Sequence, residues 1–236
     1  MHIMDGIVTS PLLAGATIIA VGAVGYGLKR VAPEDIPKIA LLAAAFFVAS
    51  VIRLPIGPTS AHLMLTGLLG LVLGPAIFPA LLASLMMQTF IFGFGGITVL
   101  GLNLLNMSLP GFVAFLIFMP LLRNELFKEK SGLDASQFLK FFALSSKTRI
   151  FIIGFCAGSF AVFGSLLMVA LSLALSGQEF FAIAKFMILA NLPLAFIEGL
   201  VVGVIVQFLT SLKGEIFEVN SFHQTRSLRT SSELSS

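Results

Sequence analysis

Long apolar runs follow one another along the chain and constrain its fold more than any other feature. A helix that crosses the hydrocarbon of a bilayer needs about 20 mostly apolar residues. Runs of this kind take up most of the 236 residues, of which 58% are hydrophobic and 11% charged. We therefore expect an all-α polytopic membrane protein with about seven transmembrane helices, at residues 10–28, 36–54, 60–74, 76–97, 104–122, 149–175 and 181–211.

The chain divides into one long apolar region and a short polar end. Residues 1–211 predict a single transmembrane domain, in which Gly74-Pro75 separates the third helix from the fourth because proline cannot donate a helix hydrogen bond. Residues 212–236 are rich in serine and threonine and predict a flexible cytoplasmic tail. The polar stretch 123–148 indicates a cytoplasmic loop that contains an interfacial helix.

Basic residues indicate how the helices are oriented. If the N-terminus lies outside, all 14 lysines and arginines except Arg53 and Lys185 fall on the cytoplasmic side. Such an excess of positive charge is typical of cytoplasmic loops. No lysine or arginine precedes the first apolar run, so this run is expected to be an uncleaved helix and not a signal peptide. We therefore expect an external N-terminus and a cytoplasmic C-terminus.

The first two residues could form a chelator at that external end. The α-amine of Met1, the amide nitrogen of His2 and the imidazole of His2 can lie in one plane around a metal. His62, expected one turn into the third helix on the same side of the membrane, could supply a fourth nitrogen. Square-planar nitrogen coordination is typical of Ni(II) or Cu(II). Because the terminus must fold back to meet His62, we expect it to be inserted toward the bundle centre. The alternative is that His62 is an isolated polar residue satisfied by helix-end groups.

Three motifs, in this order, resemble those of the CbiM/NikM family, the substrate-capture (S) subunits of nickel and cobalt energy-coupling factor (ECF) transporters. MHIMDG is similar to the family's opening MHIMEG, GPTSAHL to its Thr-Ser-x-His-Leu segment, and GGITVLGLNLLNM to its Gly-Gly-Leu/Ile-Thr-x-Leu-Gly-x-Asn stretch. The resemblance covers roughly residues 1–210 and implies that Met1, His2 and His62 hold Ni(II) or Co(II) as the transported substrate. Asp5 replaces the family's usual Glu, and the tail is not matched.

The resemblance also implies partners in a bacterial cytoplasmic (inner) membrane. A transmembrane coupling (T) subunit and two ATPase (A) subunits would drive ATP-dependent uptake, with a small accessory membrane subunit as a further partner. No P-loop motif occurs in this chain, so the ATP site is expected on the partners. No nucleic-acid partner is expected, and lipid surrounds the helices. Small residues on the second helix either dock the coupling subunit or pack internally; these are Ala40, Ala44, Ala45 and Ala49.

Several other polar residues are candidates to support the site. Asp5, Thr59 and Ser60 lie within the motifs themselves. Asn103 is expected in the external loop after the fourth helix, either as a hydrogen-bonding lid over the terminus or as a polar contact between helices.

Glu198 is the one carboxylate well inside a predicted span. It could orient a ligand, support a polar network, or carry protons. In the last case the protein would be a self-sufficient secondary transporter or channel, which is the alternative function. No nucleophile-and-base pair and no carboxylate dyad is evident, so we do not expect an enzyme.

Overall fold

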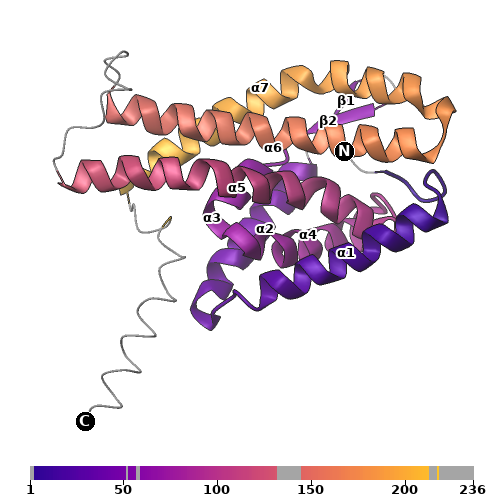
Figure 1. Cartoon of the computed structure of the whole chain (residues 1–236), viewed down its shortest axis with the longest axis horizontal. Coiled ribbons are helices and arrows are strands. Elements are labelled where there is room, and N and C mark those ends of the chain that lie inside the picture. The colour runs from indigo at the N-terminus through magenta and orange to yellow at the C-terminus, as the bar shows by residue number, and fades with distance from the viewer. Residues whose placement is uncertain (1–2, 52, 57–58, 132–144, 213–216, 218–236) are drawn as a thin grey trace, which may run out of the picture.

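The computed structural model describes residues 3–51, 53–56, 59–131, 145–212 and Phe217, and helices dominate this part of the chain (Figure 1). Two short strands form an antiparallel hairpin, and short 3-10 turns precede α2, α4 and α7. The elements in order are α1 (Ser10–Leu28), η1 (Pro33–Asp35), α2 (Ile36–Val51), β1 (Arg53–Ile56), β2 (Thr59–His62), α3 (Thr66–Leu73), η2 (Gly74–Ala76), α4 (Ile77–Phe92), α5 (Leu100–Ser131), α6 (Ser146–Ser176), η3 (Gln178–Phe180) and α7 (Phe181–Leu212).

Five helical segments of the described chain are long and apolar enough to cross a membrane. They are Ser10–Leu28, Thr66–Phe92, Leu100–Phe127, Ser146–Ser176 and Phe181–Leu212. The helix α2 has only 16 residues. The helix α3 has eight and continues through η2 into α4, so the two together make one span. The protein is therefore a multi-pass helical membrane protein, and the count of seven spans stays a prediction.

The hairpin and the turn after it correct the prediction that residues 53–54 and 60–65 are helical. Arg53 pairs with His62 and Ile56 pairs with Thr59 across the two strands. A proline disfavours the helical conformation of the residue before it, and Pro55 and Pro58 both fall in this stretch. The third helix consequently begins at Thr66, after Leu65 has adopted a left-handed φ of 50°.

The short helix α3 lies at the centre of the bundle, and all eight of its residues are buried. Glycines allow the neighbouring helices to approach its backbone. A methyl group on Gly67 would lie 2.6 Å from Cα of Gly158 on α6, and one on Gly70 would overlap the backbone of Gly111 on α5. The predicted break at Gly74-Pro75 is confirmed, because α3 ends there in the turn η2.

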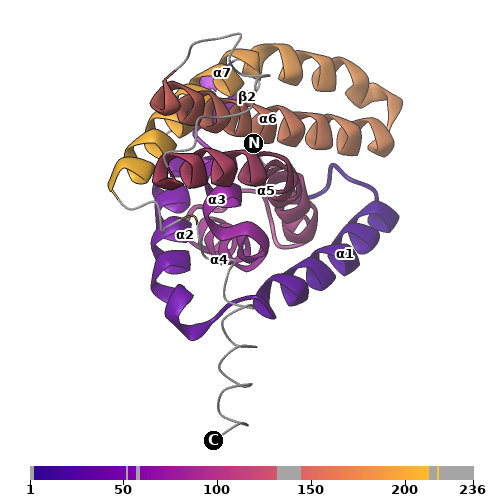
Figure 2. The same ribbon diagram turned by 60° about the vertical axis from the view of Figure 1, so that its left-hand side comes forward.

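The long helices α5, α6 and α7 pack beside this centre, whereas α1 lies along the outside of the bundle (Figures 1 and 2). A methyl group on Gly154 of α6 would come within 3.0 Å of Gly203 on α7. The helix α5 runs without a break to Ser131. The prediction that residue 123 begins a loop is therefore wrong, because the helix continues from its apolar part through the polar residues 123–131. Residues 132–144, where the interfacial helix was expected, lie outside the described residues.

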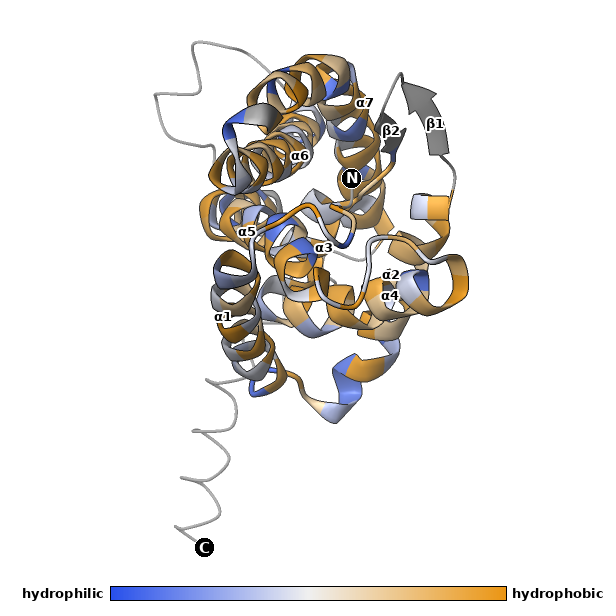
Figure 3. Cartoon of the chain, turned by 90° about the vertical axis from the view of Figure 1, so that its right-hand side faces the viewer, coloured by the Kyte–Doolittle hydropathy of each residue, from blue (hydrophilic) through white to orange (hydrophobic). Residues whose placement is uncertain are grey.

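Large apolar side chains face outward on most of the helices. Among the most exposed are Ile18 on α1, Leu41 on α2, Phe90 on α4 and Leu189 on α7. Figure 3 shows the long helices coloured hydrophobic along most of their length, with hydrophilic colour at the turn between α1 and α2. An apolar exterior of this kind is suited to lipid and not to water.

Candidate functional site

The N-terminal segment is anchored inside the protein by a single side chain of α5. The amide of Ile3 donates to Oδ1 of Asn103 over 3.0 Å, and Nδ2 of Asn103 donates to the carbonyl of Ile3 over 3.0 Å. A carboxamide thus pairs with both backbone groups, as a neighbouring strand would. Ile3 is 3% exposed and Asn103 is 2% exposed. We call this pair of hydrogen bonds the inner clamp; Met1 and His2, which precede it, lie outside the described residues.

Asn103 does not lie in a loop, which corrects its expected position. Its backbone amide donates to the carbonyl of Val99 over 2.9 Å, so it belongs to the first turn of α5. The apolar run that predicted this helix began at residue 104, because Asn103 and the glycine at position 101 were assigned to the loop. A helical position fixes the side chain more firmly than a loop would.

A second contact holds the same segment farther out. The hydroxyl of Thr98 donates to Oδ1 of Asp5, and both residues are exposed. The loop that carries Thr98 contains three glycines with positive φ, Gly93, Gly95 and Gly96. Sequence reasoning singled out Asp5 but missed Thr98, although Thr98 lies within the third motif.

His62 is the last residue of β2 and is 3% exposed. It does not lie one turn into a helix as expected. Its Nδ1 lies 3.2 Å from the carbonyl oxygen of Leu63. A carbonyl can only accept, so Nδ1 carries the proton when this hydrogen bond forms, and Nε2 then carries the lone pair that a metal needs. Thr59 and Ser60 lie on the same strand, but their side chains lie outside the described part of the structure.

Glu198 fixes the turn that follows His62. This residue of α7 is fully buried, and the amide of Met64 donates to its Oε1. The amide of Leu65 also donates, at 3.2 Å from Oε1 and 3.1 Å from Oε2. The carboxylate therefore meets the backbone donors at the N-terminus of α3, where a negative charge is favourable. Asn191, on the same helix, donates to the carbonyl of Met187 over 2.9 Å.

The strand that ends in His62 lies among the helices, since β2 contacts both α2 and α7. Within the described residues, no three His, Cys, Asp or Glu side chains converge to hold a metal. That Met1, His2 and His62 form a metal site stays a prediction.

The alanines of α2 do not share one environment. Ala40, Ala44 and Ala45 are exposed, whereas Ala49 is partly buried against the core. Two hydrogen bonds from α4 also hold this helix. Ser84 donates to the carbonyl of Ala43 over 2.7 Å, and Gln88 donates to the hydroxyl of Ser50 over 2.7 Å. Packing is thus the observed role of Ala49, and docking by the other three stays a prediction.

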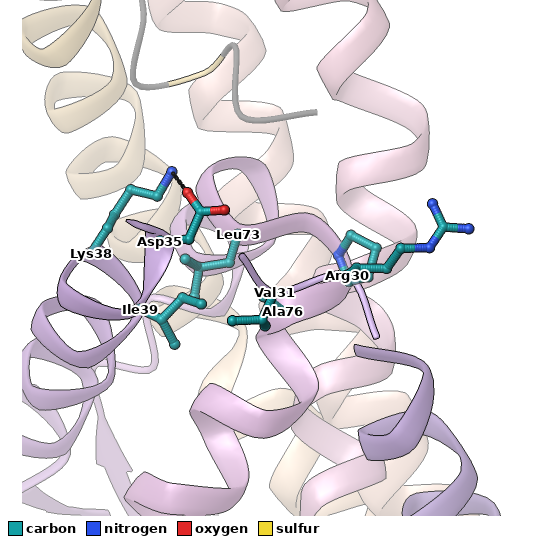
Figure 4. Close-up of a pocket in the computed structure, with 8 residues that line it drawn as sticks. Arg30, Val31, Asp35, Lys38, Ile39, Leu73 and Ala76 are labelled. Atoms are coloured by element: carbon teal, nitrogen blue, oxygen red, sulfur yellow. Dashed lines mark ion pairs between the residues drawn. The ribbon is translucent and has the colours of Figure 1, made fainter. Parts of the chain in front are cut away.

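A small pocket lies at the turn between α1 and α2, beside the break that follows α3 (Figure 4). It holds an ion pair of 3.5 Å between Lys38 Nζ and Asp35 Oδ1. The guanidinium of Arg30 points away from the pocket, 5.3 Å from the centroid of the Tyr26 ring. Because its charged groups pair with partners of their own, we assign the pocket no ligand.

The fold is shared with solved structures. A crystal structure described as a transition metal transporter superposes with a TM-score of 0.69 at 22% identity, over 95% of this chain and 97% of that one. At this identity the likeness shows the fold alone. Together with the apolar exterior, it defines the class as a helical, multi-pass protein with a transition-metal transporter fold.

Sequence comparison then shows the family. The family model described as "Cobalt uptake substrate-specific transmembrane region" (CbiM) matches residues 2–216, and this chain belongs to that family. A "Putative metal transport protein" of Haemophilus influenzae is 33% identical over 87% of this chain and 91% of its own length. The "Fused nickel transport protein NikMN" of Rhodobacter capsulatus is 40% identical over 47% of this chain and 34% of its own length. These relatives are named as transport proteins and not as enzymes.

Proposed function

We propose that this protein is the metal-capture subunit of an ECF-type importer and binds Ni(II) or Co(II) at the external face. The observation that carries the proposal is the inner clamp, because it holds Ile3 in the protein interior through both of its backbone polar groups. A clamp of this kind orders the main chain one residue away from His2. A free terminus would need no buried partner.

The proposed ligands are nitrogens of Met1, His2 and His62. The amine, the deprotonated amide and the imidazole of the first two residues supply three donors in one plane, and Nε2 of His62 completes the square. The contact between Nδ1 of His62 and the carbonyl of Leu63 supports this assignment, since it leaves the lone pair on the other nitrogen. Each donor must lose a proton to bind, so affinity falls on acidification.

The supporting residues act on the backbone and not on the metal. Asn103 positions the N-terminal segment, and Glu198 positions the turn between His62 and α3. Asp5 holds the segment at the surface, and Thr59 and Ser60 belong to the strand that carries His62. The contacts of Glu198 with two backbone amides favour this role over a proton pathway in a self-sufficient transporter.

The remaining parts of the proposal concern orientation and partners. The N-terminus faces outward and the C-terminus faces the cytoplasm, as the placement of lysine and arginine indicates. The membrane is a bacterial inner membrane, as the resemblance to the family implies. A transmembrane coupling subunit docks on Ala40, Ala44 and Ala45, and two ATPase subunits supply the energy. The fused form of the Rhodobacter relative supports association with another membrane subunit.

Extension of the N-terminus tests the ligand set directly. Three residues added ahead of Met1 remove the amine and displace His2, so we expect bound Ni(II) or Co(II) to fall from one per chain to background. The control adds the same three residues after Ser236. Metal content is measured by elemental analysis of purified protein, with folding checked by gel filtration. Undiminished metal in the N-terminally extended protein would remove Met1 and His2 from the site.

A further inference from the structure

Two contacts at different depths hold the N-terminal segment. The inner clamp between Ile3 and Asn103 is buried and joins uncharged groups. The outer contact between Asp5 and Thr98 is exposed and joins a carboxylate to a hydroxyl donor. The clamp fixes the main chain two residues before Asp5, so the outer contact limits how far the segment can swing away from the bundle.

The loop that carries Thr98 is shaped around Asp5. Gly96 has a φ of 154°, and a methyl group at this position would overlap the Asp5 carboxylate. The first turn of α5, which follows this loop, lies against α1, since a methyl group on Gly101 would lie 2.8 Å from Cα of Thr17. The carboxylate thus occupies the space that the missing Cβ leaves, with Thr98 donating to it.

We infer that Gly96 and Thr98 form an outer latch, which retains the N-terminal segment through Asp5 and thereby sets the rate of metal release. The inference deepens the proposed function and rests on it for the metal. A metal held by Met1 and His2 leaves only when the segment swings out, and the latch must open before it does. Thr98 and Gly96 are positioning residues, because they act through Asp5.

The latch can be tested without metal through hydrogen exchange of the Ile3 amide, in the full-length protein labelled with 15N-isoleucine in lipid nanodiscs. In Thr98→Val we expect exchange about threefold faster or more, because the hydroxyl donor to Asp5 is lost. Gly96→Ala should accelerate it further, and Thr98→Ser should match the wild type. The control is Thr89→Val, which removes a hydroxyl bonded to the carbonyl of Phe94 in the same loop.

The second measurement is the release of Ni(II), followed by stopped flow with an excess of chelator. Thr98→Val should release the metal about threefold faster or more while its association rate changes little. The double variant of Thr98→Val and Asp5→Asn should release Ni(II) no faster than either single variant, since both changes remove the same contact. Thr98→Ser should release at the wild-type rate.

The outcomes separate the latch from the proposed function. Unchanged exchange in Thr98→Val, or equal acceleration in Thr89→Val, would overturn the latch whatever the metal does. Faster exchange without any binding of Ni(II) or Co(II) in the wild type would support the latch and refute the proposed function. Faster exchange with unchanged Ni(II) release would overturn the link between the latch and release.

Discussion

Between α6 and α7 the two backbones touch at glycines, whereas the turn after His62 and the N-terminal segment are held by side-chain hydrogen bonds. Gly154 and Gly203 leave no space for a Cβ, and the neighbouring Gly158 lies against Val202 in the same way. At the site, Asn103 and Glu198 each contact the backbone of a segment that is remote in sequence. Close packing tolerates no added atom, but directional contacts can be removed without moving a helix.

The difference indicates which contacts stabilise the fold and which position the candidate site. In lipid, helices associate through close contact at small residues and not through burial of apolar surface from water. The glycine interfaces therefore hold the helices together, and the hydrogen bonds of Asn103 and Glu198 position the two segments without being needed for helix packing. Substitutions in the first region should cost the fold, and substitutions in the second should cost affinity in a protein that remains folded.

The largest effect is expected from Gly70→Val, which breaks the packed region at its centre. The new side chain would overlap the backbone of Gly111, which cannot rotate aside as a side chain can. We expect a loss above the about 1–3 kcal/mol of ordinary overpacking, seen as lost yield and a much lower thermal midpoint in detergent. Gly22→Val is the matched control, because Gly22 faces open space. Equal stability of the two variants would contradict the central role of α3.

The next effect tests the other side of the comparison. His62→Ala should weaken binding of Ni(II) or Co(II) by about 100-fold or more, because one of the proposed nitrogens is lost. The thermal midpoint of the metal-free protein should stay near that of the wild type. Titration calorimetry measures the affinity, and His223→Ala in the tail is the matched control. Wild-type affinity in the His62 variant would exclude this residue from the site.

Asn103→Ala should have a smaller effect that acts through the main chain. Two hydrogen bonds of about 0.5–1.5 kcal/mol each are lost, which corresponds to roughly 5-fold to 150-fold weaker metal binding. Asn106→Ala, on the same helix and equally buried, controls for loss of a buried carboxamide. The same calorimetry applies. An equal loss in both variants would show that the inner clamp has no special part in binding.

The smallest effect on the isolated protein is expected from Ala44→Leu. Ala44 is exposed, so the larger side chain should leave both the thermal midpoint and metal affinity unchanged. Co-purification with the coupling subunit should fall, because the close approach of another helix is blocked. Ala49→Leu, at a partly buried position, should instead lower stability. Unchanged co-purification of the Ala44 variant would remove this face from the docking surface.

Much of the fold could be predicted because apolar runs and their breaks act locally. A run of about 20 apolar residues has few alternatives to a helix, and Pro75 ends one wherever the rest of the chain lies. The hairpin was missed because the apolar runs at 36–54 and 60–74 extend into its two strands. The signal was present in Pro55 and Pro58, which together disfavour a helix in a stretch too short to hold another one.

The site could be predicted only as a set of residue types. The chemistry of Met1, His2 and His62 follows from their nitrogens, and the motifs drew attention to Asn103 and Asp5. Their partners could not be read in this way, because Ile3 and Asn103 are 100 residues apart and Leu65 and Glu198 are 133 apart. Contacts over such distances depend on how the helices pack, and single-sequence patterns carry little information about packing.

The separation between Ile3 and Asn103 also determines when the site can form during synthesis. Ile3 leaves the ribosome 100 residues before its partner, and the turn at Leu65 leaves 133 residues before Glu198. A nascent chain that has inserted α1 to α4 can therefore anchor neither segment. Both contacts are complete only when α7 has been made, so an incomplete chain in the membrane lacks the anchored turn that follows His62.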